Sequence, residues 1–182
     1  MMNKLNLYLH RMQAVDSALC VTVSHTNQYR IIRNLFRAAS RLGDGVFWYT
    51  LMIAIIVTQQ ADGIMPVLHM ALAASTGTLI YKWLKQKTLR PRPFQVRQDV
   101  WVVGKPLDKF SFPSGHTLHA VVFGLVAMSY YPGLAVVLVP FMLMVAMSRV
   151  ILGLHYPSDV VAGASIGYAI VQASYFLKDY LL

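Results

Sequence analysis

The chain has 182 residues, of which 57% are hydrophobic and only 13% are charged, with a net charge of +9. A soluble domain has about 25% charged residues, so this composition excludes an ordinary soluble domain and predicts a single-domain membrane protein. The positive charge suits an anionic partner. Because the chain is so apolar, we expect that partner to be an anionic lipid or a phosphorylated substrate, and not nucleic acid. The single cysteine, Cys20, allows no internal disulfide.

Residues 1–44 differ in composition from the rest of the chain. In the stretch NQYRIIRNLFRAASRL, residues 27–42, apolar and basic side chains lie on opposite faces of a helix. The apolar face consists of Ile31, Ile32, Leu35, Phe36 and Ala39, and the basic face of Arg30, Arg33, Arg37 and Arg41. This pattern predicts a helix that lies in the membrane interface and contacts anionic lipids. An amphipathic helix that packs on the bundle without a lipid role is an equal alternative.

The sequence LGDG at 42–45 is expected to break this helix before the first of five apolar stretches. A membrane span needs about 20 mostly apolar residues. The five stretches are 45–60, 63–83, 116–131, 133–153 and 157–177, of which the first and third are short. YYPG at 130–133 predicts a tight turn, and Gly163 and Gly167 form a G-x-x-x-G pattern that permits close helix packing. We therefore predict an all-α, polytopic transmembrane helical bundle of about five spans (a sixth is possible).

These patterns divide the chain into amphipathic, interfacial N-terminal helices at 1–44 and a transmembrane catalytic core at 45–182. The core contains one long polar segment, 84–115, which is rich in Pro, Gly, Lys and Arg. A loop of this length is usually functional, so we interpret 84–115 as an active-site loop.

Two polar clusters lie in this segment. In KQKTLRPRP, Lys85 supplies a point charge and Arg92 a planar fork that can grip two oxygens; a basic patch that only attracts anionic lipids is the simpler alternative. In FPSGHT, Ser114 offers a hydroxyl and Gly115 lets an anion approach the backbone. His116 then opens a helix whose free N–H groups attract anions. A Ser-Gly helix cap with an incidental histidine would give the same pattern.

The third cluster is SRVILGLHYPSD, residues 148–159, in the most apolar third of the chain. Charged side chains at membrane depth are expensive and usually functional. Pro157 suits the first turn of a helix, so His155 and Asp159 lie on the same side, and Asp159 can accept a hydrogen bond from the imidazole. The alternative is a structural ion pair between Arg149 and Asp159.

The order of the spans brings all three clusters to one membrane face. Together they contain more cations and free N–H groups than anions, which suits a phosphate group and suits a metal ion poorly. A neutral imidazole is a sensible nucleophile for a phosphate monoester, because the dianion repels anionic nucleophiles, and the cations would stabilise the charge that builds on the transferring oxygens.

The clusters also resemble a known signature. It reads Lys85-x6-Arg92-Pro93, then Pro113-Ser114-Gly115-His116, then Ser148-Arg149-x5-His155-x3-Asp159. This three-part pattern is similar to that of the type 2 phosphatidic acid phosphatase superfamily, and the resemblance covers roughly residues 40–178. Two features depart from many relatives: Leu89 stands where they have a Gly before the Arg-Pro-Arg-Pro stretch, and a first span is missing or replaced by the amphipathic N-terminus.

The resemblance implies a function for each motif residue. His155 would form a phosphohistidine, Asp159 would orient and activate it, and His116 would protonate the leaving oxygen. The phosphate would be bound by Lys85, Arg92, Arg149, Ser114 and the backbone of Gly115. No metal and no cofactor is implied. Substrates of the superfamily include phosphatidic acid, phosphatidylglycerophosphate, polyprenyl pyrophosphates and the lipid A phosphate. We expect a lipid phosphate or pyrophosphate phosphatase of this kind, in the inner (cytoplasmic) membrane of a bacterium.

Three other functions stay open at this point: a lipid phosphotransferase of the same superfamily, a non-catalytic protein that binds anionic lipids, and a metal-binding membrane protein. The last would use His116, His119, His155 and Asp159, but the nearby cations would repel a metal ion. The membrane face of the site is a further expectation. With five spans, every Lys and Arg except Lys178 falls on the side of the active site, and the positive-inside rule then favours a cytosolic site.

Overall fold

The computed structural model describes residues 4–106 and 108–181, so residues 1–3, 107 and 182 of the predicted segments lie outside the described part. All regular elements in the described ranges are helical, which confirms the all-α prediction. Five long helices form the bundle: α3 (Phe47–Gln59), α4 (Ile64–Thr88), α6 (Gly115–Tyr130), α7 (Ala135–Ile151) and α8 (Pro157–Leu181). They correspond in order and position to the five predicted spans.

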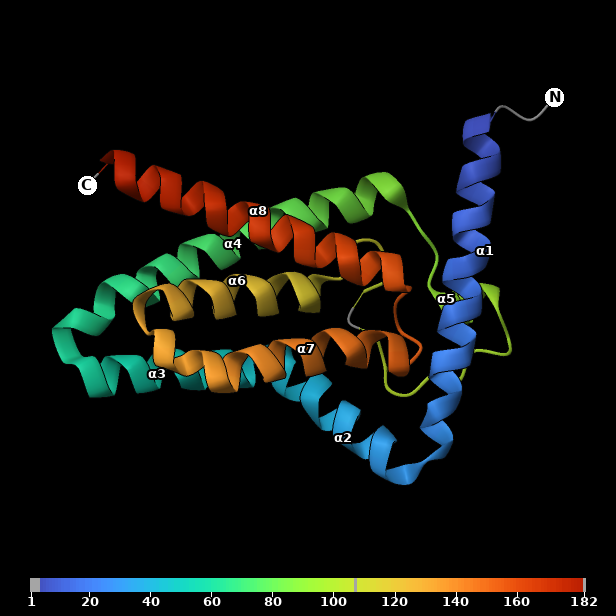
Figure 1. Ribbon diagram of the computed structural model, residues 1–182, viewed down its shortest axis with the longest axis horizontal. Coiled ribbons are helices and arrows are strands. Elements are labelled where there is room, and N and C mark those ends of the chain that lie inside the picture. Colours follow the sequence, from blue (N-terminus) through green and yellow to red (C-terminus); the bar gives the residue numbers. More distant parts are fainter. Residues whose placement is uncertain (1–3, 107, 182) are drawn as a thin grey trace.

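The bundle is arranged around α6. This helix packs against α4, α7 and α8, and in Figure 1 it runs through the middle of the bundle. Three segments are long and apolar enough to cross a membrane: Arg30–Val96, which contains both α3 and α4, Pro132–Ile151 and Pro157–Leu177. With 16 residues, α6 is shorter than a typical span, and its many buried side chains show that neighbouring helices cover most of it.

Two glycines allow α8 to lie directly on α6. A Cβ atom at Gly163 would lie 2.5 Å from the carbonyl oxygen of Ser114, and one at Gly167 would lie 2.8 Å from that of Leu118. Any side chain at these positions would therefore push the helices apart. The predicted role of the G-x-x-x-G pattern in close packing is confirmed, and the contact of Gly163 fixes the start of α6 against α8.

The N-terminal helices lie at one end of the bundle. Helix α1 (Lys4–Ser24) crosses that end, and the short 3-10 helix η1 (His25–Gln28) leads to α2 (Arg30–Arg41) (Figure 1). Helix α2 packs on α7 and buries Ala39 and Ser40. On its predicted apolar face, Ile31 is 83% exposed and Leu35 is 51% exposed, so protein does not cover that face completely.

The predicted break at 42–45 is a kink. The π-helical segment η2 (Leu42–Val46) joins α2 to α3, and the chain changes direction at Gly45, whose φ of 135° favours glycine. A second connection, the 3-10 helix η3 (Gln60–Gly63), joins α3 to α4, and η4 (Pro132–Leu134) forms the predicted turn between α6 and α7.

The polar segment begins later than predicted. Residues 84–88 belong to α4, because the helix continues to Thr88 and ends at Leu89, which has left-handed backbone angles (φ 48°, ψ 25°). The resemblance noted above leads us to expect a glycine here, and glycine adopts such angles without strain. The rest of the segment is a loop that contains only the short helix α5 (Pro93–Val96). Backbone hydrogen bonds from Val103 to Leu152 (3.0 Å) and from Ser111 to Arg90 (2.9 Å) hold it over the end of the bundle.

Candidate active site

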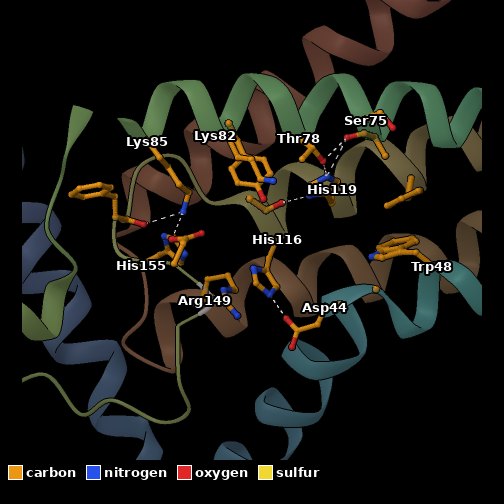
Figure 2. Close-up of a pocket in the computed structure, with 18 of the residues that line it drawn as sticks. Asp44, Trp48, Ser75, Thr78, Lys82, Lys85, His116, His119, Arg149 and His155 are labelled. Carbon is orange, nitrogen blue, oxygen red and sulfur yellow. Dashed lines mark hydrogen bonds and ion pairs between the residues drawn. The ribbon is translucent and has the colours of Figure 1, made fainter. Parts of the chain in front are cut away.

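The three polar clusters meet at the end of the bundle that α1 and α2 cover. A cavity of about 630 Å³ opens there, and six of the eight predicted site residues line it: Lys85, Arg92, Gly115, His116, Arg149 and His155. They come from α4, the loop, α6, α7 and the turn before α8. Figure 2 shows Lys85, His116, Arg149 and His155 pointing toward a common space.

The cavity has a cationic end and an apolar end. Away from His155 it is lined by Trp48 and Met52 of α3, Ala71 of α4 and Phe123 of α6. Lys85 and Ala71 are 14 positions apart on one helix, so the cavity extends about 21 Å along α4 at 1.5 Å per residue. Such a cavity suits an amphiphile that carries an anionic group at one end.

His155 is only 1% exposed, and its hydrogen-bond partners determine its tautomer. A guanidinium nitrogen of Arg92, Nη1, lies 3.3 Å from Nε2 of His155 and 2.6 Å from the carbonyl oxygen of Leu154. Because arginine can only donate, Nε2 must be the unprotonated nitrogen. The ring proton is then on Nδ1, which lies 3.5 Å from Oδ2 of Asp159.

The surroundings of His155 keep the ring neutral. Burial is the main cause that lowers its pKa well below the ordinary value, and nearby positive charges add to it, in the order Arg149, Arg92, Lys85 and His116. Nδ1 has no hydrogen-bond partner among the described residues, because its contact with Asp159 is longer than a hydrogen bond. Contacts between catalytic groups are often long before a substrate binds.

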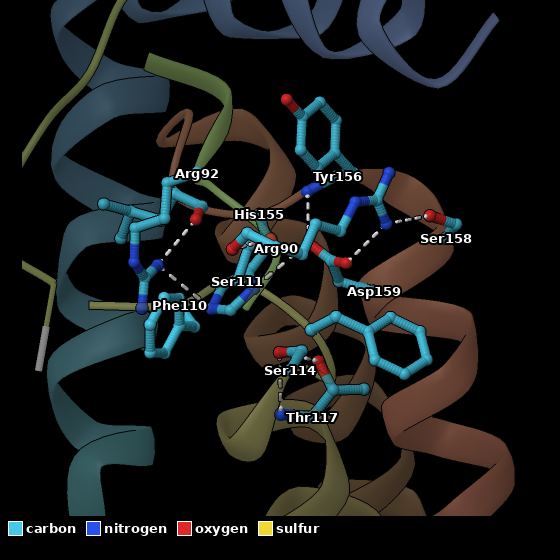
Figure 3. A network of polar contacts seen from close by, with 12 residues as sticks. Arg90, Arg92, Phe110, Ser111, Ser114, Thr117, His155, Tyr156, Ser158 and Asp159 are labelled. Carbon is cyan, nitrogen blue, oxygen red and sulfur yellow. Dashed lines mark hydrogen bonds and ion pairs between the residues drawn. The ribbon is translucent and has the colours of Figure 1, made fainter. Parts of the chain in front are cut away.

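Asp159 is completely buried and is held by groups other than His155. The backbone N–H of Tyr156 donates to Oδ2 at 2.9 Å, and Nη1 of Arg90 donates to Oδ1 at 2.7 Å (Figure 3). Arg90 also pairs with Asp16 of α1 at 2.6 Å. The alternative ion pair between Arg149 and Asp159 is therefore wrong: Asp159 pairs with Arg90.

Sequence reasoning missed Arg90 and Asp16. Arg90 is the first arginine of the Arg-Pro-Arg-Pro stretch, two positions before Arg92. Its place in that stretch was the only sequence signal for Arg90. Nη1 of Arg90 also donates to the hydroxyl of Ser158 at 2.7 Å. The backbone N–H of Ser158 in turn donates to the carboxylate of Asp16 at 2.9 Å. The N-terminal helix thus reaches the carboxylate of Asp159 through one guanidinium.

The three predicted phosphate-binding cations are buried, and a carboxylate already contacts two of them. Lys85, Arg92 and Arg149 are each 6% exposed or less. Oδ1 of Asp108 accepts hydrogen bonds from Nζ of Lys85 at 2.7 Å and from Nη2 of Arg92 at 2.8 Å. Burial raises the pKa of Asp108, but the bonds and charges of Lys85 and Arg92 outweigh it and hold this pKa below its usual range. Sequence reasoning did not identify Asp108.

Arg149 is the least satisfied of these cations. Nη1 donates to the hydroxyl of Ser40 at 2.5 Å, but Nε has no partner among the described residues. A buried donor without a partner costs about 1–3 kcal/mol, and more when it is charged. An anion bound in the cavity would supply the missing acceptor.

His116 lies in the first turn of α6 and lines the active-site cavity. Its Nε2 contacts a carboxylate oxygen of Asp44, which lies in η2 between two glycines (Figure 2). Since a carboxylate can only accept, Nε2 of His116 carries a proton in this contact. Asp44 was not identified from the sequence, where it figured only as part of a helix break.

Ser114 is placed differently from its predicted role. It is fully buried, and its hydroxyl caps α6: it accepts from the backbone N–H of Thr117 at 3.4 Å and lies 3.0 Å from the hydroxyl of that residue. It does not line the cavity. The observed contacts are those of the Ser-Gly cap, whereas Gly115, next in the chain, faces the cavity.

The remaining histidines of the bundle are hydrogen-bonded. His119 lies 2.9 Å from the carbonyl oxygen of Gly115 and 2.9 Å from the hydroxyl of Thr78, and His69 lies 2.8 Å from the hydroxyl of Ser174. In the described part of the chain, no three His, Cys or Asp side chains are placed to hold a metal ion together.

Comparison with known proteins gives a family match. Residues 66–181, more than half of the chain, match the model of the PAP2 superfamily. A lipid A 1-phosphatase of Rhizobium johnstonii is 35% identical over 74 residues, which are 40% of this chain and 30% of that protein. A lipid A 1-phosphatase of Rhizobium etli is 39% identical over 57 residues, 31% of this chain and 25% of that protein. The match thus spans less than a third of the length of these curated relatives.

Two solved structures share the fold over most of the chain. A transmembrane PAP2-type phosphatidylglycerolphosphate phosphatase from Bacillus subtilis has a TM-score of 0.74 at 24% identity, covering 94% of this chain and 88% of that chain. Aquifex aeolicus LpxE has a TM-score of 0.76 at 25% identity, covering 87% of this chain and 93% of that chain. The helical architecture described above is therefore that of known transmembrane proteins.

Proposed function

This chain belongs to the PAP2 superfamily, and we propose that it is an integral-membrane lipid phosphatase that uses His155 as its nucleophile. The observation that carries the proposal is the neutral, buried imidazole of His155 at the cationic end of a cavity whose other end is apolar. A phosphate group would bind to the cations, and the lipid chain would lie along α3 and α4.

In the first step, the lone pair on Nε2 of His155 attacks phosphorus. A P–N bond forms, and the P–O bond to the lipid breaks. The leaving oxygen takes the electron pair of that bond and the Nε2 proton of His116, which acts in its imidazolium form, with a proton on each ring nitrogen and the carboxylate of Asp44 beside it. Lys85, Arg92 and Arg149 stabilise the charge on the other phosphate oxygens. Asp159 faces the Nδ1 proton and stabilises the positive ring that results.

In the second step, water attacks the phosphorus of the phosphohistidine. His116, now neutral, accepts a proton from the water, the P–N bond breaks, and inorganic phosphate leaves while His155 returns to its neutral form. None of these steps requires a metal ion, so we expect a chelator to leave the rate unchanged. Vanadate, which mimics the five-coordinate phosphorus, is expected to inhibit.

We propose that the substrate is a phosphorylated membrane lipid. The names of similar proteins favour the 1-phosphate of lipid A and phosphatidylglycerophosphate as candidates, and phosphatidic acid and a polyprenyl pyrophosphate fit the same cavity chemistry. All four combine an anionic group with long apolar chains, as the two ends of the cavity require.

The test is release of inorganic phosphate from each of these four lipids by the purified full-length protein at one detergent concentration. His155→Ala is expected to abolish release. His25→Ala is the matched control, because His25 lies on η1 and does not line the cavity, and it should retain the wild-type rate. Wild-type rates in His155→Ala would refute the assignment. Transfer of the phosphate to a second lipid, with no free phosphate released, would indicate a phosphotransferase.

We also propose a cytosolic active site in a bacterial inner membrane, based on the distribution of charge. Of the 16 Lys and Arg residues, only Lys178 lies at the opposite end of the bundle, in the far half of α8, so the positive-inside rule favours a cytosolic location for the site end. With five spans, the C-terminus should then lie outside the cytosol. A reporter that is active only outside the cytosol should therefore give a signal when it is fused after Leu182. A cytosolic reporter signal would contradict this orientation.

A further inference from the structure

A second cavity, of about 580 Å³, lies beside the active-site cavity. The two cavities share three lining residues, Asp44, His116 and Arg149, which lie next to one another in Figure 2. The second cavity therefore adjoins the phosphate site at His116, the residue proposed to protonate the leaving group. A part of the substrate that lies beyond the bond that breaks would face this space.

The walls of the second cavity are strongly basic. Arg37 and Arg41 lie one turn apart on α2, and Lys105 comes from the loop on the other side. None of these three side chains makes a hydrogen bond or an ion pair with another residue of the described ranges. Asp44 is the only carboxylate among the described residues that line it, and it is engaged with His116.

Arg149 connects this basic cluster with the active site. It is 2% exposed, lines both cavities, and has no partner for Nε in the described structure. Its bond to Ser40, another lining residue, keeps the guanidinium turned toward α2. Four cations and one carboxylate surround this space, so its net positive charge favours a bound anion.

We propose that the second cavity is a subsite for a second phosphate group of the same lipid substrate, on the leaving-group side of the bond that breaks. The inference rests on the proposed function, since it assumes that His116 marks the leaving-group side. Arginine side chains are suited to this ligand because their planar fork binds two phosphate oxygens at once. The preferred substrates are then lipids with two phosphates, and a lipid with only one phosphate leaves the subsite unused.

The location of the cluster argues against general attraction of anionic lipids. Arg30 belongs to the same basic face of α2 but does not line the cavity, and neither does Arg11 of α1. If only the total charge of the N-terminal helices mattered, all of these arginines would contribute equally. A subsite requires Arg37 and Arg41 in particular.

The test compares two variants that lose the same charge, Arg37→Gln with Arg41→Gln and, as the control, Arg11→Gln with Arg30→Gln. Each is assayed with two substrate pairs: farnesyl pyrophosphate against farnesyl phosphate, and lipid A against the same lipid without its 4′-phosphate. In at least one pair, the cavity variant should raise KM about tenfold or more for the member with two phosphates. KM for the other member, and both values in the control, should change less than twofold.

Several results would overturn the proposal. An equal rise in KM for both members of each pair, or the same change in the control, would show general charge attraction. No change in either pair would show that the cavity is not used. A cavity variant that alters only inhibition by inorganic phosphate would assign the cluster to free phosphate and not to the substrate.

Failure of the proposed function can be separated from failure of the subsite. The same lipid pairs are bound to His155→Ala in detergent, and their dissociation constants are measured without turnover. A preference for the member with two phosphates that is lost when Arg37 and Arg41 are also replaced supports the subsite even if no lipid is hydrolysed. Equal binding of both members refutes it.

Discussion

The carboxylate of Asp108 contacts two of the cations that we expect to bind phosphate, so it should compete with the phosphate group. Asp108→Asn removes the charge at nearly constant volume. The carboxylate makes hydrogen bonds to Lys85 and Arg92, and charge-assisted bonds contribute about 1.5–3 kcal/mol each when they are buried. The Asp108 side chain is 39% exposed, so solvent reduces this contribution and we expect a net effect of about 1.4 kcal/mol. That difference corresponds to a tenfold tighter binding of phosphate.

The assay is inhibition of lipid phosphate hydrolysis by inorganic phosphate, the product. The inhibition constant should fall about tenfold in Asp108→Asn. Asp99→Asn is the control, because Asp99 lies on the same loop but pairs with Arg97 at the surface, and it should leave the constant unchanged. An inhibition constant that stays the same, or that rises because Asp108 holds the cations in position, would refute the reasoning.

Three further predictions concern the acidity of the nucleophile and the backbone around the site. The pKa of His155 lies well below its ordinary value of about 6.5, so the ring stays neutral as pH falls through 6.5. The acid limb of kcat/KM should then lie below 6.5, and a midpoint at 6.5 or higher would contradict the burial argument. Gly163→Ala places a Cβ 2.5 Å from the carbonyl oxygen of Ser114, so it should cost about 1–3 kcal/mol of stability and lower phosphate release at least tenfold. Gly133→Ala, which meets nothing within 4 Å, should change neither, and equal effects of the two would argue against a packing cause. Leu89→Gly should stabilise the protein by about 1 kcal/mol, because it relieves left-handed backbone angles at a residue that is 56% exposed; a lower thermal unfolding midpoint would show that packing of Leu89 outweighs the strain.

The helices and the meeting of the motifs could be predicted because both follow from local patterns. A membrane span requires a continuous apolar run, and such runs mark the five long helices to within a few residues, except that α4 continues into the polar segment. Successive spans reverse direction, which brings Lys85, Arg92 and Arg149 to one end without any knowledge of the loop. The sequence at 42–45 predicted a break in the helix, but it did not predict the angle of the kink at Gly45.

The carboxylates of the site could not be predicted, since their contacts depend on the path of loops and on long-range packing. Asp108 bonds to a lysine 23 positions away, Asp44 to a histidine 72 positions away, and Asp16 to an arginine 74 positions away. No periodicity links such pairs. Hydroxyl and carboxylate groups also have several uses, which is why Ser114 was expected to contact the phosphate and is found as a helix cap.

The link between Asp16, Arg90 and Asp159 has a consequence for shortened versions of this protein. Among the residues of α1 whose side chains are described, none lines the cavity, yet deleting α1 takes away one of the two carboxylates that share the Arg90 guanidinium. The carboxylate of Asp159 would then be the only one that binds this guanidinium. It would therefore attract the Nδ1 proton of His155 less strongly. We therefore expect the N-terminal helix to affect the reactivity of His155 from outside the cavity. The effect of affinity tags or deletions at that end on turnover should be measured before they are treated as neutral.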